Sequence, residues 1–378
     1  MRDYLNRDGK IRFIFPIDGD CINVNDGYER DGMLCVKVIV KADGVKNLEI
    51  NEKPATFNGE NFELEMSFPY GRTTLVAKNT DNGEETAKIV VLRLKNATGI
   101  YRLSSDDNII FLKDINDNKD TYTSIFDNPY LAVYKEAHDK YGANVQLNIH
   151  YECKEYANFS TDRGYFNLSM MTDKFKEEWE ANSSWLRLSF HAKDVMPRMP
   201  YRNTTMTEIS EDAKQIHAEI IRFAGEKTLC SNATTVHWGE CTLDGVRGLR
   251  NIGVKGLFGY FYNRKATGEP SVSYHYPAYF VDYLRNRDFW YDTEEDVLFG
   301  RIDSVLNSLT LEGVIPKMES IKANPGNAGG LDIMIHEQFF YEDFSAYIPE
   351  FKEIVLTACK WAQENGYKGY YMEELMNW

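Results

Sequence analysis

The chain has 378 residues, of which 43% are hydrophobic and 27% are charged, and its formal net charge is −15. This composition is typical of a globular protein, and the length corresponds to two or three domains at roughly 100–200 residues each. The negative charge argues against nucleic acid or anionic lipid as a partner, and no apolar run approaches the ~18 residues that a membrane-spanning helix requires.

The N-terminal sequence, MRDYLNRDGKIRF, lacks the apolar core of a signal peptide. We therefore expect a cytoplasmic protein by default, or an extracellular or cell-surface protein if a leader was removed. The six cysteines form no CxxC pair, which argues against a zinc ribbon or a thioredoxin-like motif. Buried free thiols are the simpler interpretation.

The first quarter of the chain has the pattern of short β-strands. Segments 33–42, 46–68 and 73–94 are separated by glycine- and asparagine-containing turns. Such spacing is typical of a β-sandwich. The pattern resembles the bacterial immunoglobulin-like modules that accompany carbohydrate enzymes, and we expect residues 1–97 to form such a domain. No histidine precedes residue 138, so we interpret this domain as a spacer, with carbohydrate binding as the alternative.

Strands and helices alternate in the rest of the chain. The predicted strands are 108–115, 145–151, 185–191, 233–238, 254–261, 331–336 and 369–375. The predicted helices are 127–143, 172–182, 207–224, 244–253, 310–324 and 349–366. This alternation favours a distorted, seven-stranded β/α barrel over residues 98–378. An open doubly wound sheet is the alternative, but it would need a glycine-rich first turn, which residues 111–117 do not provide.

Four of the seven histidines fall at the carboxyl ends of predicted strands: His150, His191, His237 and His336. Asp114 ends the first predicted strand, and Glu373 lies at the end of the last. In a β/α barrel these strand ends converge on the face that carries the active site. We therefore expect at least three of the histidines to share one pocket.

Imidazole and carboxylate groups at one pocket suggest a divalent metal such as zinc, cobalt or nickel. Such an ion would polarise a carbonyl, and a neighbouring histidine or carboxylate would transfer protons. Alternatively, Glu240 and Glu337 would act as the carboxylate pair of a metal-free glycoside hydrolase. We expect Trp238, His150, Glu337 and Glu373 to contact the substrate.

A further feature is the concentration of aromatic residues in segment 258–299. Aromatic rings offer flat apolar faces that suit a sugar ring or a protein interface. The simpler interpretation is a small additional core beneath a long loop.

Several motifs of the second region are those of a known superfamily. They are FLKD (111–114), SFHA (189–192), TVHWGECTLDGVRGLRNIG (235–253), and IMIHEQ (333–338) followed by a helix and an acidic final strand. With these motifs, residues 105–378 resemble the polysaccharide deacetylase (NodB-homology) superfamily of glycoside hydrolase/deacetylase β/α barrels.

The resemblance implies a hydrolase that removes acetyl groups from an N- or O-acetylated poly- or oligosaccharide. It implies Asp114 and His191 as metal ligands and His336 as general acid. His237 would be a third ligand or would stabilise the oxyanion, and Glu240 would be a base or an orienting carboxylate.

The chain also departs from the superfamily pattern. Ile115 stands where the first motif has a second acid, Val195 where a second metal histidine is usual, and His237 where the family has arginine. Two alternatives therefore stay open beside the metal-free hydrolase: a site built from Asp114, His191 and His237, or a non-catalytic carbohydrate-binding pseudoenzyme.

Overall fold

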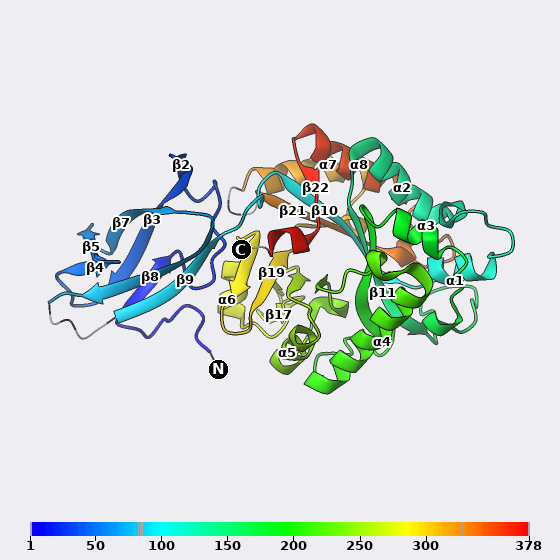
Figure 1. The fold of residues 1–378 in the computed structure, drawn as a ribbon, viewed down its shortest axis with the longest axis horizontal. Helices are drawn as coiled ribbons and strands as arrows, with labels where there is room; N and C mark the ends of the chain where they lie inside the picture. Colours follow the sequence, from blue (N-terminus) through cyan, green and yellow to red (C-terminus); the bar gives the residue numbers. More distant parts are fainter. Residues whose placement is uncertain (1, 82, 84–85, 325, 327, 377–378) are drawn as a thin grey trace.

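The N-terminal strands form two antiparallel sheets packed face to face (Figure 1, left). The computed structural model describes residues 2–81, 83, 86–324, 326 and 328–376. One sheet has the order β1–β3–β7–β6, with β2 paired to β3, and the other has the order β5–β4–β8–β9. The bounds are β1 Ile11–Phe15, β2 Tyr28–Arg30, β3 Met33–Ala42, β4 Leu48–Ile50, β5 Lys53–Pro54, β6 Thr56–Phe57, β7 Phe62–Phe68, β8 Gly71–Asn79 and β9 Thr86–Arg93.

The core of this sandwich is formed by side chains that alternate along the strands. In β3, Leu34, Val36, Val38 and Val40 are buried, whereas Lys37 is exposed. This period of two directs one face of each sheet towards the other. Burial of each such apolar side chain contributes about 1.5–3 kcal/mol. The two sheets agree with the β-sandwich expected for this part of the chain.

The second part is a ring of parallel strands (Figure 1, right). One sheet contains the parallel order β20–β21–β10–β11–β13, and a second contains β14–β15–β19. A bridge between Leu188 and Leu229 joins the sheets at one side, and the Asp303 amide donates to the Asp332 carbonyl at the other. The bounds are β10 Ile100–Asn108, β11 Val145–Cys153, β13 Leu186–Asp194, β14 Ala233–Thr234, β15 Gly256–Gly259, β19 Val297–Arg301, β20 Ser304–Val305 and β21 Gly330–His336.

Short strands extend this framework at its edges. They are β12 Phe166–Asn167, β16 Tyr262–Asn263, β17 Pro270–Ser271, β18 Phe289–Asp292 and β22 Lys368–Gly369. β18 pairs antiparallel with β19, and β22 pairs with the beginning of β10. The strands and helices therefore form a distorted β/α barrel, in line with the alternation in the sequence.

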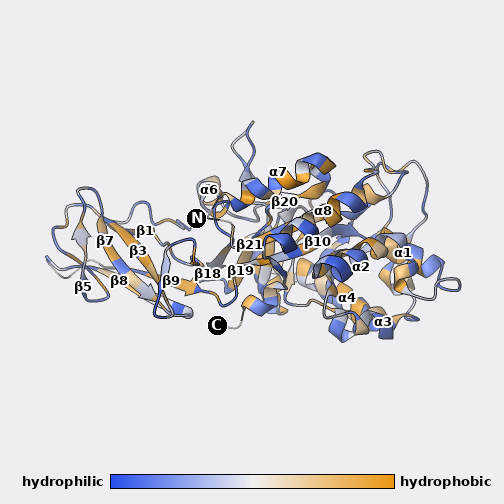
Figure 2. Cartoon of the chain, turned by 90° about the horizontal axis from the view of Figure 1, so that it is seen from above, coloured by the Kyte–Doolittle hydropathy of each residue, from blue (hydrophilic) through white to orange (hydrophobic). Residues whose placement is uncertain are grey.

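Helices surround the ring, and several show both apolar and polar residues (Figure 2). Their bounds are α1 Ile110–Asp117, α2 Pro129–Tyr141, α3 Lys176–Ala181, α4 Met206–Ala224, α5 Leu243–Asn251, α6 Ala278–Leu284, α7 Leu311–Lys322 and α8 Phe351–Glu364. The ends of α2 are those expected, with Asn128 accepting from the Leu131 amide and Gly142 in the left-handed conformation. Among the described residues, no helix combines the length and the apolar character that spanning a bilayer requires.

Two predicted strands are wrong. Segment 108–115 contains the start of α1, and the first barrel strand lies earlier, over β10. β10 is rich in polar residues, but they are satisfied inside the ring: the Arg102 guanidinium donates to the Asp332 carboxylate over 2.7 Å and to Gln146 Oε1 over 3.0 Å. Segment 369–375 contains only the end of β22, followed by a 3₁₀ helix over Met372–Leu375.

The sandwich rests against β18 of the barrel. Asp20 forms an isolated bridge with Trp290, and the Trp290 indole N–H donates to the Asp18 carbonyl over 2.8 Å. Apolar residues from both parts form one shared cluster, which we call the junction core. It includes Leu92, Leu94, Phe258, Phe289, Tyr291 and Met372. The aromatic segment 258–299 is divided between this core, which contains Phe258 and Tyr291, and the main barrel core, which contains Phe261 and Trp290, instead of forming a small core of its own.

Candidate metal centre

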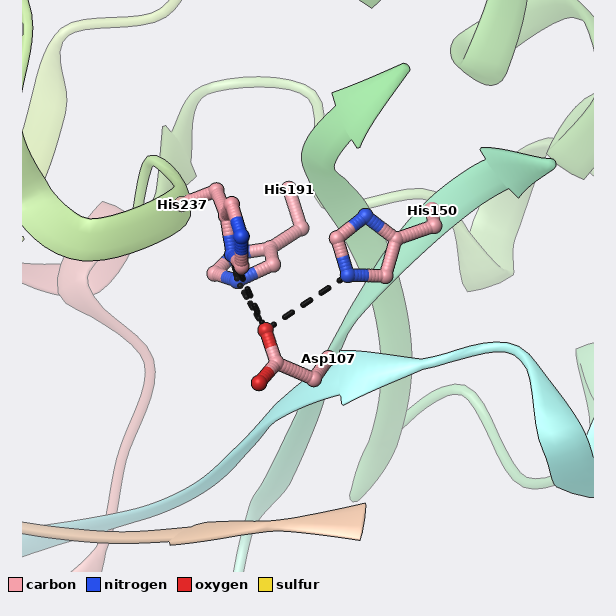
Figure 3. Close-up of side chains that lie close together, drawn as sticks. All are labelled: Asp107, His150, His191 and His237. Atoms are coloured by element: carbon pink, nitrogen blue, oxygen red, sulfur yellow. Dashed lines mark hydrogen bonds and ion pairs between the residues drawn. The ribbon is translucent and has the colours of Figure 1, made fainter. Parts of the chain in front are cut away.

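Four potential metal ligands meet at the carboxyl ends of neighbouring strands (Figure 3). Asp107 ends β10, His150 lies in β11, His191 lies in β13 and His237 begins a 3₁₀ turn after β14. One ligand atom from each lies within 4.8 Å of all the others. The Asp107 Oδ1 atom is 2.9 Å from His237 Nδ1, 3.1 Å from His191 Nε2 and 3.5 Å from His150 Nε2.

Irregularities of the backbone aim these side chains at one another. The register between β10 and β11 shifts between Ser105 and Asn108, and Asp107 has a positive φ of 62°. The register between β11 and β13 shifts next to His150. A bulge turns side chains out of the regular alternation, and backbone strain of this kind tends to gather at functional sites. The chain thus departs from ideal strand geometry where the cluster is built.

Hydrogen bonding presents the lone pairs of this cluster to a common point. His191 Nδ1 is 2.6 Å from the carbonyl oxygen of Thr235, so this nitrogen carries the proton and Nε2 faces Asp107. Gln338 Nε2 donates to Asp107 Oδ2 over 3.0 Å, which leaves Oδ1 for the histidines. Such outer partners orient the ligands of protein metal sites.

His150 gives the clearest test of whether a cation fits. The ring is fully buried; Nδ1 has no hydrogen-bond partner, and Nε2 has only the long 3.5 Å contact with Asp107 Oδ1. Buried polar atoms are normally paired, and an unpaired one costs about 1–3 kcal/mol. A divalent ion held between Asp107 and the imidazoles would satisfy His150, so the donor set fits a metal.

The electrostatics of the cluster also suit a cation. Burial lowers the pKa of His150 to about 3, so its imidazole is neutral and can donate a lone pair. Burial alone would raise the pKa of Asp107, but the neighbouring imidazoles hold it well below its usual value, and His237 has the largest effect among them. Burial lowers the pKa of His237, whereas the nearby Asp106 and Asp107 outweigh burial and raise that of His191.

Two clefts open beside the cluster and share four residues that form the wall between them. These residues are Asp107, His237, Trp238 and Gln338. The first cleft, of about 470 Å³, also contains Asp106 and His336, and we call it the His336 cleft. The second, of about 420 Å³, contains Phe159, and we call it the Phe159 cleft.

The His336 cleft contains the remaining groups able to transfer protons. Asp106 and His336 are register partners in β10 and β21. Asn148 Nδ2 donates to the Asp106 carboxylate over 2.5 Å. His336 Nδ1 lies 2.8 Å from Asn307 Oδ1, so Nδ1 carries the proton and Nε2 remains for exchange with a ligand.

The residues predicted from strand ends divide into two groups. His150, His191, His237 and His336 come together at one face of the barrel, with Trp238 beside them. Glu373 does not: its carboxylate pairs with Arg187, near the beginning of β13, whereas His191 lies towards the end of that strand. The prediction for Glu373 is wrong because the final strand is too short to carry it to the active face.

Asp114 is not a member of the cluster. It lies on α1, and its carboxylate accepts hydrogen bonds from Asn118, Tyr122 and Asn128 at 2.7–3.0 Å. The carboxylate of the cluster comes from Asp107 instead of Asp114. The signal in the sequence was the pair Asp106–Asp107, two adjacent acids just before the segment that we predicted to be the first barrel strand.

The two glutamates of the glycosidase alternative are not found at the clefts. Glu337 is fully buried, and its carboxylate accepts from the backbone amides of Ile109, Ile110 and Phe111 at the start of α1. Burial raises its pKa to about 7. Glu240 is half-buried and lines neither cleft, although both residues are described in the structure.

Comparisons with known proteins give structural similarity only. No protein-family model and no curated protein sequence matches the chain. A mutant of a CE4 family pseudoenzyme from Bacillus anthracis, with restored enzymatic activity, is 11% identical with a TM-score of 0.34, over 81% of this chain and 87% of that one.

Two further structures illustrate the range of similar proteins. The peptidoglycan N-acetylglucosamine deacetylase Bc1960 is 8% identical with a TM-score of 0.36, over 75% of this chain and 90% of that one. The catalytic domain of a GH26 endo-β-1,4-mannanase from a Bacillus species is 14% identical with a TM-score of 0.29, over 75% and 81%. Since each TM-score is below 0.5, the function rests on the site's own residues.

Proposed function

We propose that this protein is a metal-dependent hydrolase that removes an acyl group from an N- or O-acylated sugar. The observation that carries the proposal is the convergence of Asp107, His150, His191 and His237 within 4.8 Å, with His150 buried and making no hydrogen bond. The adjacent His336 cleft supplies the proton-transfer groups that hydrolysis requires.

The four side chains would hold a divalent ion such as zinc, cobalt or nickel. When bound, the ion would polarise the acyl carbonyl and lower the pKa of a water molecule. A carboxylate with three imidazoles suits these ions. Gln338 and the Thr235 carbonyl keep Asp107 and His191 in orientation.

The chain's own residues account for the proton transfers. Asp106 accepts a proton from the attacking water, and Asn148 holds its carboxylate in place. In this step His336 reacts as the imidazolium, with Nδ1–H held by Asn307, and donates its second proton from Nε2 to the leaving nitrogen or oxygen. The water oxygen bonds to the acyl carbon, and the bond from that carbon to nitrogen or oxygen breaks. The products are a carboxylate and an amine or alcohol.

The His336 cleft supports a sugar as the leaving group. Trp238, Tyr260 and Tyr262 line it and offer aromatic faces with polar edges. The net charge of −15 favours a neutral substrate and a neutral or cationic product, such as an amino sugar. We assign the sandwich, which we expect to be an immunoglobulin-like domain ending near residue 97, a packing role because these site residues lie outside it.

The other candidate functions have less support. The pseudoenzyme alternative rested on Ile115 and Val195, but the adjacent acids are Asp106 and Asp107, and His150 supplies a third imidazole. The metal-free glycosidase requires Glu337, whose carboxylate is occupied at the start of α1.

The test is to load the purified chain with zinc, cobalt or nickel, desalt it and determine bound metal by mass spectrometry. We expect about one equivalent, and acetate release from N-acetylated chito-oligosaccharides that stops with a chelator and returns with metal. The variant His191→Ala should lose both metal and activity. A well-folded chain that binds no metal would refute the proposal.

A further inference from the structure

The two clefts on either side of the metal centre differ in chemistry. Asp106 and His336 line only the His336 cleft. The Phe159 cleft is lined mainly by apolar side chains, with Glu155, Asn158 and Arg198 among its polar members. Its apolar lining includes Ile109, Ile110, Phe159, Val195, Met196 and Phe344. Arg198 itself lies against the Trp238 ring, 4.3 Å from its centroid.

The wall of the Phe159 cleft is built from segments that are tied together. Phe159 forms an isolated bridge with Phe344, and their ring centroids are 5.0 Å apart. The Ser160 amide donates to the Asp343 carbonyl over 2.9 Å, and the Ser345 amide donates to the Asn158 carbonyl over 2.9 Å. The cleft is therefore preformed, which lowers the ordering cost of binding.

We propose that the Phe159 cleft receives the acyl chain of the substrate and that this chain is longer than acetyl. This inference rests on the proposed function. The leaving atom must lie near His336, so the leaving group occupies the His336 cleft. The acyl carbon must lie at the metal cluster. Its substituent then passes Asp107 and Gln338, which line both clefts, and enters the Phe159 cleft.

The size of the Phe159 cleft argues for a chain rather than a methyl group. A cavity needs about 10–15 Å³ of accessible space to hold one water molecule, whereas the cleft offers about 420 Å³. Each buried methylene contributes about 0.8 kcal/mol, a factor of about four in affinity. An acetyl group would leave most of this apolar surface in contact with water, so longer acyl groups should bind more tightly.

The first experiment measures binding rather than turnover. Alkyl hydroxamates, which chelate metal ions through their head group, are titrated into the metal-loaded full chain by calorimetry. Four added methylenes should make hexanohydroxamate roughly 200-fold tighter than acetohydroxamate, at about fourfold per methylene. Val195→Trp, and the smaller Val195→Phe, should remove this gain by filling the Phe159 cleft while acetohydroxamate affinity stays within about twofold.

A matched control fills the opposite cleft. Ser308 is exposed and lines only the His336 cleft, so Ser308→Trp should preserve the dependence on chain length. N-acetyl-, N-butanoyl- and N-hexanoylglucosamine then serve as substrates, and we expect KM to fall with chain length in the wild type but not in Val195→Trp.

The outcomes distinguish the acyl-chain assignment from the underlying proposal of a metal-dependent hydrolase. Equal affinity for all hydroxamates would overturn the acyl-chain assignment and leave the hydrolase proposal standing. The same holds if Val195→Trp weakens binding of chito-oligosaccharides instead, because the cleft would then hold a second sugar ring. Failure of the chain to bind metal would overturn both.

Discussion

The variant His150→Leu separates a metal ligand from a buried structural histidine. In the metal-free chain, the buried ring nitrogens of His150 make no hydrogen bond, and Nε2 has only the 3.5 Å contact with Asp107; leucine removes both nitrogens while retaining an apolar side chain. We expect the metal-free variant to be as stable as the wild type, or more stable by about 1–3 kcal/mol, because that is the cost of an unpaired buried polar group.

The effect on metal binding should be much larger and opposite in sign. Four-ligand zinc sites bind with about 10–16 kcal/mol, so each ligand accounts for about 2.5–4 kcal/mol. Loss of His150 should therefore weaken binding by roughly 10²–10³-fold. At metal concentrations above both dissociation constants, the metal-induced gain in unfolding free energy should fall by about 2.7–4.1 kcal/mol.

The assay is urea unfolding of wild type and variant, with and without one chosen ion. His217→Leu is the matched control, since His217 lies on α4 and outside the cluster. It should leave the metal-induced stabilisation unchanged. A His150→Leu chain that is strongly destabilised without metal, yet gains as much from metal as the wild type, would refute the assignment of His150 as a ligand.

Three further predictions follow from contacts around the site and the barrel. Gln338→Met removes the donor to Asp107 and should weaken metal affinity about 10–100-fold in a competition titration; an unchanged affinity would contradict an orienting role. Glu337→Ala should lower the unfolding free energy by at least about 3 kcal/mol, since it strips three buried amides of their acceptor. Glu337→Gln keeps one acceptor oxygen and should stay active, whereas inactivity of the folded variant would favour a carboxylate-pair hydrolase. Burial raises the pKa of Asp303 to about 7, so the folded chain holds a proton there that the unfolded chain releases near pH 4. This stabilisation is complete below about pH 4 and is lost as the pH rises towards 7, at about 1.4 kcal/mol per pH unit. Asp303→Asn should remove that slope in urea unfolding between pH 5 and 7, and an unchanged slope would contradict the assignment.

The fold was largely predictable because the helices and most strands carry clear periodicity. The exception, β10, combines polar side chains such as Arg102 and Asp106 with complete or nearly complete burial. Those groups find their partners on strands far away in the sequence, as Arg102 does with Asp332. The local pattern of polar and apolar residues gives no sign of such pairing, so β10 was not predicted as a strand.

The histidines of the site were predictable, but its carboxylate was not. His191 and His237 follow apolar strand segments, so the rule that strand ends converge in a barrel locates them. Asp107 ends the one strand whose pattern was hidden. Asp114 was chosen instead because the apolar run Ile109–Leu112 resembles a strand, although Glu337 caps that run as the start of a helix.

The junction core also has a consequence for how the protein is made. Leu92 and Leu94 precede their partners Phe289 and Met372 by about 200–280 residues, or roughly 10–60 s of synthesis at 5–20 residues per second. During that interval one end of the nascent sandwich keeps an apolar surface open to chaperones or to other chains. The sandwich is thus synthesised first, and its side of the junction core is covered only when synthesis of the barrel is nearly complete.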